Sequence, residues 1–234
     1  FNLNASAAIT AAPTNASLTA VESFLATTTA ALTLDLSGTG YSDLTSIQVT
    51  NAGDATTLTG SATADITSTT TSQAGNNVTV DGGKDVSVTT TGSAATGLIT
   101  VGATTAAAGT VTISNTSAAT GGVTMGAIAA TGGTTISVTE AGGNAVATTD
   151  TMGAVTVTGD ASTTTVSVVQ NDAATAAAAV KGIVNGAVTV NDANRASATA
   201  AGTITDVTLD SFGVAEVNSG ALTTLTLSGT GTSV

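Results

Sequence analysis

The sequence predicts an all-β protein, a parallel β-solenoid built from short and irregular rungs. Three observations lead to this expectation. Short runs such as SIQVT and TISVT alternate apolar and hydroxyl residues, which places Val and Ile on one face of a strand and Thr and Ser on the other. Val and Thr are β-branched and favour strands. The runs recur at intervals of roughly 8 to 13 residues, as expected for solenoid rungs.

Amino-acid usage separates the solenoid from its main alternative, tandem β-sandwich domains. The chain has one Tyr, three Phe and no Trp, whereas sandwich cores normally contain several large aromatic anchors. A solenoid interior is narrow, and Val, Ala, Ile and Thr fill it well. Gly suits corners that need a positive φ, and Asn and Asp suit turns. The composition therefore favours the solenoid over the sandwich.

The expected strands follow in chain order from the alternating runs. They are residues 32–36, 46–50, 78–80, 86–88, 98–101, 110–113, 123–125, 135–139, 154–157, 165–169, 187–190, 203–209 and 222–227.

Two segments break this pattern and predict short helical inserts that pack on the sheets. In the first, at about residues 19–28, Thr19 and Glu22 have the spacing of a capping box. In the second, residues 172–184, Asp172 is a candidate cap and Gly182 lies near the end.

Internal repeats divide the chain into a β-rich segment with a short helix, residues 1–75, and a solenoid repeat region, residues 76–234. GGVTM (121–125) and the two GAVTV runs (153–157 and 186–190) each open a unit. Glu140 and Gln170 occupy matching places after TISVT and TVSVV, which predicts a shared loop geometry. Since the chain begins without Met or a basic leader, we expect it to be a segment of a longer protein.

Charge and missing residue types exclude several functions. Three basic residues, Lys84, Lys181 and Arg195, accompany 15 acidic ones, for a net charge of -12, so nucleic acids and anionic membranes would be repelled. Without His and Cys, the chain can form neither a Ser–His pair nor a thiolate nucleophile. Basic and aromatic residues are too scarce for a typical sugar-cleaving groove, and we expect no enzyme.

Acidic residues beside strand ends are candidate ligands for Ca²⁺, which prefers carboxylate and carbonyl oxygens. The DGGKD turn places two acids around two glycines, although an ordinary turn with a Lys84 ion pair would explain it equally. The candidate ligands are Asp81, Asp85, Asp150, Asp160, Asp172 and Asp192.

Two further patterns have plain explanations. The N-x-S/T sequons at Asn4, Asn15, Asn77 and Asn115 are expected by chance in a chain this rich in Thr and Ser. Aligned ranks of Thr on a β-solenoid can bind ice, but this requires the same motif to align through many equal coils. The unequal spacing of the runs argues against such alignment.

Two long stretches, GAVTVTGDASTTTVSVVQ (153–170) and GTITDVTLDSFGVAEVNSGALTTLTLSGTG (202–231), resemble the repeats of proteobacterial, Caulobacter-type surface-layer proteins. The resemblance implies export by type I secretion and a β-solenoid that assembles a Ca²⁺-dependent two-dimensional lattice (S-layer) on the cell surface. It also implies anchoring to outer-membrane lipopolysaccharide through a region outside this segment. The Ca²⁺-binding nonapeptide repeats and the secretion signal of the family would likewise lie outside it.

The sequence therefore predicts a structural protein that assembles with copies of itself, with Ca²⁺ acting on assembly more than on folding. One alternative is a binding module, the stalk or adhesin segment of a large exported protein. A less favoured alternative is a solenoid enzyme that degrades polysaccharides.

Overall fold

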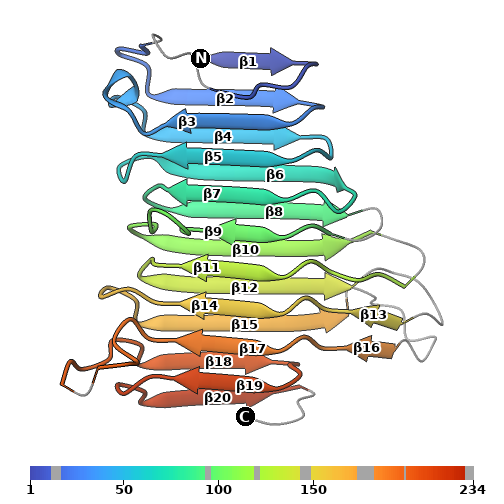
Figure 1. Ribbon diagram of the computed structural model, residues 1–234, viewed down its shortest axis with the longest axis vertical. Helices are drawn as coiled ribbons and strands as arrows, with labels where there is room; N and C mark the ends of the chain where they lie inside the picture. Colours follow the sequence, from blue (N-terminus) through green and yellow to red (C-terminus); the bar gives the residue numbers. More distant parts are fainter. Residues whose placement is uncertain are drawn as a thin grey trace.

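The computed structural model describes residues 1–11, 17–92, 96–118, 122–142, 149–172, 182–197 and 199–229. These residues form a parallel β-solenoid in which coils stack along one axis (Figure 1). A ten-stranded sheet, the large sheet, has the order β1-β2-β4-β6-β8-β10-β12-β15-β18-β20. An eight-stranded sheet, the small sheet, has the order β19-β17-β14-β11-β9-β7-β5-β3, and β13 and β16 form a third, short sheet. The predicted fold class is confirmed.

The longest strands, of six to nine residues, belong to the large sheet. The strands of this sheet are β1 Asn2–Ala5, β2 Ser23–Thr28, β4 Ser46–Asn51, β6 Asp65–Gln73, β8 Val86–Gly92, β10 Thr110–Ser117, β12 Thr135–Gly142, β15 Thr165–Asp172, β18 Asp206–Asp210 and β20 Thr224–Ser228. The small sheet contains β3 Leu32–Leu36, β5 Thr56–Gly60, β7 Val78–Gly82, β9 Ile99–Val101, β11 Ile128–Thr131, β14 Val155–Thr158, β17 Val188–Asn191 and β19 Ala215–Asn218. The short sheet pairs β13 Thr149–Thr151 with β16 Gly182–Val184.

Alternation along each strand creates the core. In β8, Val86 and Val88 point inward and are buried, whereas Ser87 and Thr89 point outward. Parallel pairing repeats this pattern from coil to coil, so inward residues form columns. One column consists of Ile47, Ile66, Val86, Val111, Ile136, Val166 and Val207. The interior is thus a thin layer of Val, Ile and Leu, which explains why so few aromatic residues suffice.

Two edges connect the sheets, and they differ in chemistry. At the acid-capped edge, turns lead from a strand of the small sheet into the next strand of the large sheet, on the left in Figure 1. At the ladder edge, on the right, the chain leaves the large sheet and returns to the small one. Glycines with positive φ shape turns of the acid-capped edge, as at Gly82 (φ 70) and Gly83 (φ 87).

The helix expected at residues 19–28 is not present, and this prediction was wrong. Ser23–Thr28 form β2, whose inward Phe24 and Ala26 are buried while Leu25 points outward. Pairing with both β1 and β4 supplies backbone hydrogen bonds and burial that an isolated helical turn lacks. The only helical element among the described residues is a 3-10 turn, Thr39–Tyr41.

The helix expected at residues 172–184 falls largely outside the described residues. Both of its ends are strands: Asp172 is the last residue of β15, and Gly182–Val184 form β16. The prediction was wrong at residues 182–184, which are extended, whereas a cap at Asp172 is not tested because the residues that follow it lie outside the described part. Pairing of β16 with β13 accounts for the extended backbone at 182–184.

Register corrects one of the predicted repeats. The GAVTV runs at 153 and 186 are equivalent, since Val155 pairs with Val188. GGVTM is not their counterpart, because Ile128 is the residue in register with Val155. The equivalent unit begins at Gly126. Both sheets also continue across residue 75, where β5 pairs with β7 and β6 with β8.

Candidate functional site

Carboxylates of the acid-capped edge bind backbone N–H groups of the following coil. The Asp81 Oδ1 accepts hydrogen bonds from the N–H groups of Thr104 (2.8 Å) and Thr105 (3.4 Å). The Asp85 Oδ1 accepts one from Thr110 N–H at 2.7 Å. The two acids of the DGGKD turn therefore bind different backbone segments of the neighbouring coil.

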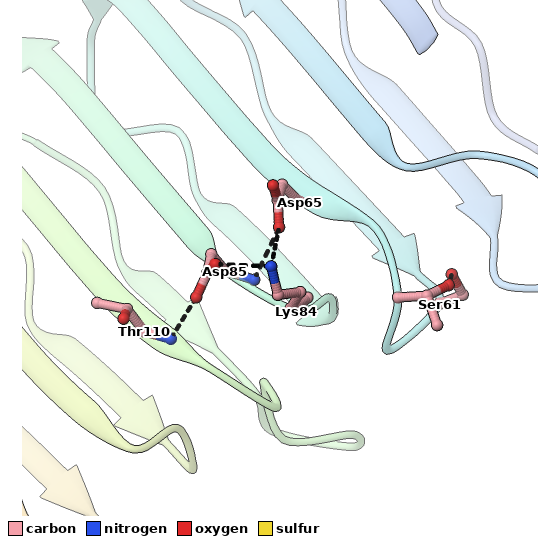
Figure 2. Close-up of polar contacts among 6 residues, drawn as sticks. Ser61, Asp65, Lys84, Asp85 and Thr110 are labelled. Atoms are coloured by element: carbon pink, nitrogen blue, oxygen red, sulfur yellow. Dashed lines mark hydrogen bonds and ion pairs between the residues drawn. The ribbon is translucent and has the colours of Figure 1, made fainter. Parts of the chain in front are cut away.

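Lys84 lies between two acids at the start of neighbouring strands, as Figure 2 shows. Its Nζ is 3.4 Å from Asp85 Oδ2 and 3.9 Å from Asp65 Oδ1. The hydrogen bond from Thr110 N–H and the charge of Lys84 hold the pKa of Asp85 below its ordinary value. About half of each side chain is exposed, so solvent screens these ion pairs.

Asp160 closes its own turn. Its Oδ1 accepts hydrogen bonds from Ser162 N–H (2.7 Å), Ser162 Oγ–H (2.6 Å) and the Thr163 hydroxyl (3.3 Å). Burial raises the pKa of Asp160, but these hydrogen bonds outweigh it and the pKa lies below the ordinary value.

Asp192 is fully buried and anchors a long turn. Its Oδ2 accepts hydrogen bonds from the N–H groups of Thr203 (2.6 Å) and Ile204 (2.9 Å) and from the Ser219 hydroxyl (3.1 Å), while Asn194 N–H donates to Oδ1 at 3.2 Å. Burial raises the pKa of this carboxyl, but the hydrogen bonds together lower it by more, so the pKa lies below its ordinary value. The carboxylate acts as a structural bridge between three segments.

The remaining candidate ligands lie at the ladder edge. Asp150, in β13, is buried, and its Oδ1 accepts a hydrogen bond from Val123 N–H at 3.0 Å. The Asp172 backbone ends β15, and its side chain lies outside the described part of the structure. Among the described residues, no three acidic side chains come together to hold a metal ion.

A buried row of polar side chains at the ladder edge, the polar ladder, escaped sequence analysis except for its last two members. Its residues are register partners on seven neighbouring strands of the large sheet. They are Thr28, Asn51, Thr70, Thr90, Asn115, Glu140 and Gln170. The matching positions of Glu140 and Gln170 are confirmed, but the shared loop expected for them is not, because both lie within strands β12 and β15.

Direct hydrogen bonds link four consecutive members of the polar ladder, in three steps. The Thr90 hydroxyl donates to Asn115 Oδ1 at 2.6 Å, and Asn115 Nδ2 donates to Glu140 Oε1 at 3.3 Å. Gln170 Nε2 donates to Glu140 Oε2 at 2.8 Å and to the Gly153 carbonyl at 2.8 Å. Since Asn115 is fully buried, its sequon is not accessible for glycosylation.

Glu140 is the buried acid of this row. Burial raises its pKa to about 7, although hydrogen bonds from Gln170, Asn115 and the Gly153 backbone act in the opposite direction. Hydrogen bonding thus favours the carboxylate and desolvation favours the neutral acid. Desolvation is the larger effect.

Opposite the polar ladder, glycines form a column at the start of small-sheet strands. A Cβ added at Gly126 would overlap the Gly97 carbonyl oxygen, one at Gly153 that of Gly126, and one at Gly186 that of Gly153. The column and the polar ladder are in contact, because Gln170 binds the Gly153 carbonyl. Only glycine lets consecutive coils approach this closely.

No protein-family model matches the chain, and no curated protein matches its sequence. Within the described residues, no helix combines the length and apolar character needed to cross a membrane.

Proposed function

We propose that the chain is a structural part of a bacterial surface layer, in which copies of the protein form a two-dimensional lattice outside the cell. The observation that carries this proposal is the stacking of coils in continuous register, which makes a rod with extended faces on two sides. Rods of this kind suit repeated contacts between copies.

Charge is the second part of the proposal. With a net charge of -12, copies of the chain would repel one another unless a cation intervened. Asp65 and Asp85 sit half-exposed on neighbouring strands, and they border an open groove of about 230 Å³ that Thr67, Ser87 and Thr112 help to line. We assign Ca²⁺ a bridging role between such carboxylates of different copies. Anchoring to lipopolysaccharide would use a region outside this segment.

Electron microscopy of the purified full-length protein in millimolar Ca²⁺, and again after chelation, tests this proposal. Ordered sheets that dissolve on chelation are expected. The double variant Asp65→Asn/Asp85→Asn should need more Ca²⁺ to assemble. Glu216→Gln, an exposed acid on the outer face of β19, serves as the control and should assemble normally.

A second function, a stalk or adhesin segment, is favoured by the same rod-like stacking if copies do not associate. Single, unassembled particles with and without Ca²⁺ would refute the lattice and leave this function in its place.

A further inference from the structure

The outer face of the large sheet carries an uninterrupted row of hydroxyl groups across seven neighbouring strands, β6 to β20. Its members are register partners at the middle of each strand: Thr67, Ser87, Thr112, Ser137, Ser167, Thr208 and Thr226. All seven side chains are exposed or half-exposed. The hydrogen bonds of the described residues leave these seven hydroxyls to solvent. We call this row, together with the outward residues beside it, the hydroxyl face.

Flanking rows extend this pattern into two dimensions. On the three central strands β10, β12 and β15, nine of the twelve outward residues are Ser or Thr, and the other three are Ala141, Val169 and Asn171. The nine are Thr110, Thr112, Ser114, Thr116, Thr135, Ser137, Thr139, Thr165 and Ser167. No charged side chain lies in this central area; Asp65, Asp85, Asp206 and Asp210 lie at its margins. The centre of the hydroxyl face is therefore polar but uncharged.

Unequal coil lengths do not disturb this alignment. Successive members of the middle row are separated by 20, 25, 25, 30, 41 and 18 residues along the chain, yet each pairs directly with the next. The extra residues lie outside the strands. The unequal spacing along the sequence, which argued against aligned Thr residues, therefore does not prevent their alignment in the structure.

The spacing of the hydroxyl face is close to that of ordered water. Neighbouring strands lie about 4.8 Å apart, which sets the repeat of each row. Water molecules that are hydrogen-bonded tetrahedrally at about 2.75 Å place their second neighbours about 4.5 Å apart. Thr side chains have restricted χ1 rotamers, so an array of them is pre-ordered and loses little conformational entropy on binding. The strands of the large sheet also run in the same direction from end to end of the molecule (Figure 1).

From this arrangement we infer that the hydroxyl face binds ice, holding an ordered layer of water that joins the crystal surface. Ice is uncharged and periodic, as is the centre of this face. A crystalline glycan is the main competing ligand, and sugar platforms generally use aromatic side chains. None lies here: Phe24, Tyr41 and Phe212 are buried, and Phe1 stacks on Phe24. The hydroxyl face shares Thr67, Ser87 and Thr112 with the groove proposed for Ca²⁺ bridging, so the two activities are tested separately.

The small sheet provides an internal comparison. Its outer row begins with Thr33, Thr57, Thr79 and Thr100, is broken at Ala129, resumes with Thr156 and Thr189 and ends at Glu216. Acids stand beside it at Asp35 and Asp81. We expect the small sheet to bind ice weakly or not at all.

Thermal hysteresis and uptake into a slowly growing ice hemisphere would test the inference on the full chain, with a chelator present so that lattice assembly does not contribute. The wild-type protein is expected to enter ice and to slow its growth. Thr112→Tyr places a bulky ring in the centre of the hydroxyl face and should reduce thermal hysteresis about tenfold, since central positions dominate interface energetics. Thr156→Tyr, an equally exposed substitution on the small sheet, should leave it within about twofold of wild type.

Circular dichroism checks the fold of both variants, and Ser137→Lys replaces Thr112→Tyr if that variant does not fold. A wild-type chain that neither enters ice nor shows hysteresis would overturn the inference, as would equal losses in the Thr112 and Thr156 variants. Binding to insoluble cellulose or chitin without ice uptake would instead identify a crystalline glycan as the ligand. Lattice formation in Ca²⁺ is scored separately, so either proposal can fail alone.

Discussion

The two edges of the solenoid both supply hydrogen-bond partners to the ends of strands, but they do so with different side chains. Wherever a strand ends, its backbone polar groups need partners. At the acid-capped edge, carboxylates such as Asp81 and Asp85 supply them and stay partly in solvent. At the ladder edge, buried side chains such as Asn51 and Gln170 supply them. The two edges of one thin core thus use different caps, acids on one side and mainly amides and hydroxyls on the other, where Asp150 is an exception.

Acidity should consequently act in opposite directions at the two edges. Depressed pKa values at Asp85, Asp160 and Asp192 mean that stability is lost when the pH falls through these values. The raised pKa of Glu140 means that stability is lost when the pH rises. We therefore expect the free energy of unfolding to be greatest in mildly acidic solution.

The largest expected effect comes from the glycine column of the ladder edge. Gly153→Ala would drive a methyl group into the Gly126 carbonyl oxygen within the stack. We expect a loss of at least about 3 kcal/mol in the free energy of unfolding, measured by urea denaturation. Gly38→Ala is the control, because a Cβ there meets no atom within 4 Å and it should unfold like the wild type. Equal stability of the two variants would show that the coils can separate at this edge.

Next in size is the pH dependence of Glu140. Between its ordinary pKa of 4.5 and the folded value of about 7, the folded protein keeps a proton that the unfolded chain has released. Unfolding free energy should fall by about 3 kcal/mol across this range and then level off. Glu140→Gln should remove the fall, whereas Glu216→Gln, on an exposed face, should keep it. A flat profile in the wild type would contradict the assignment.

A smaller effect is expected at the acid-capped edge. Asp192→Ala leaves buried backbone donors at Thr203 and Ile204 without their acceptor, and should cost about 2 kcal/mol at neutral pH. Because the folded pKa is depressed, this difference should shrink as the pH falls below the ordinary value of 3.8. Asp85→Asn is the exposed comparison and should cost less than about 0.5 kcal/mol. If Asp85→Asn is the more damaging change, burial is not what distinguishes these carboxylates.

Strands in which apolar and hydroxyl residues alternate could be predicted from the sequence. Strands without this alternation, and contacts that depend on the register between coils, could not. The strands at 86–88 and 135–139 were predictable because every second residue is apolar. The strand at Ser23–Thr28 was missed because SFLATT has no hydroxyl–apolar alternation and follows a capping-box pattern. Strand β6, rich in Thr, was missed because its inward Ser68 and Thr70 are polar.

The candidate site was harder to anticipate. Asp192 looks like any turn acid in sequence, and only the packing of residues 203–204 and 219 against it shows that its oxygens are occupied. The hydroxyl face could not be predicted because its members are far apart in the sequence. Ser137 and Ser167 are 30 residues apart and are brought together solely by parallel pairing.

Unequal coil lengths combined with constant register have an evolutionary consequence. Segments between strands can gain or lose residues while Val138, Val168 and Leu209 still stack in one column. Insertions and deletions in the loops therefore leave the two sheet faces unaltered. The faces themselves change only by point substitution. A lineage of such chains could diversify its loops freely while its sheets remained almost unchanged, and sequence similarity between relatives would fade long before the shape did.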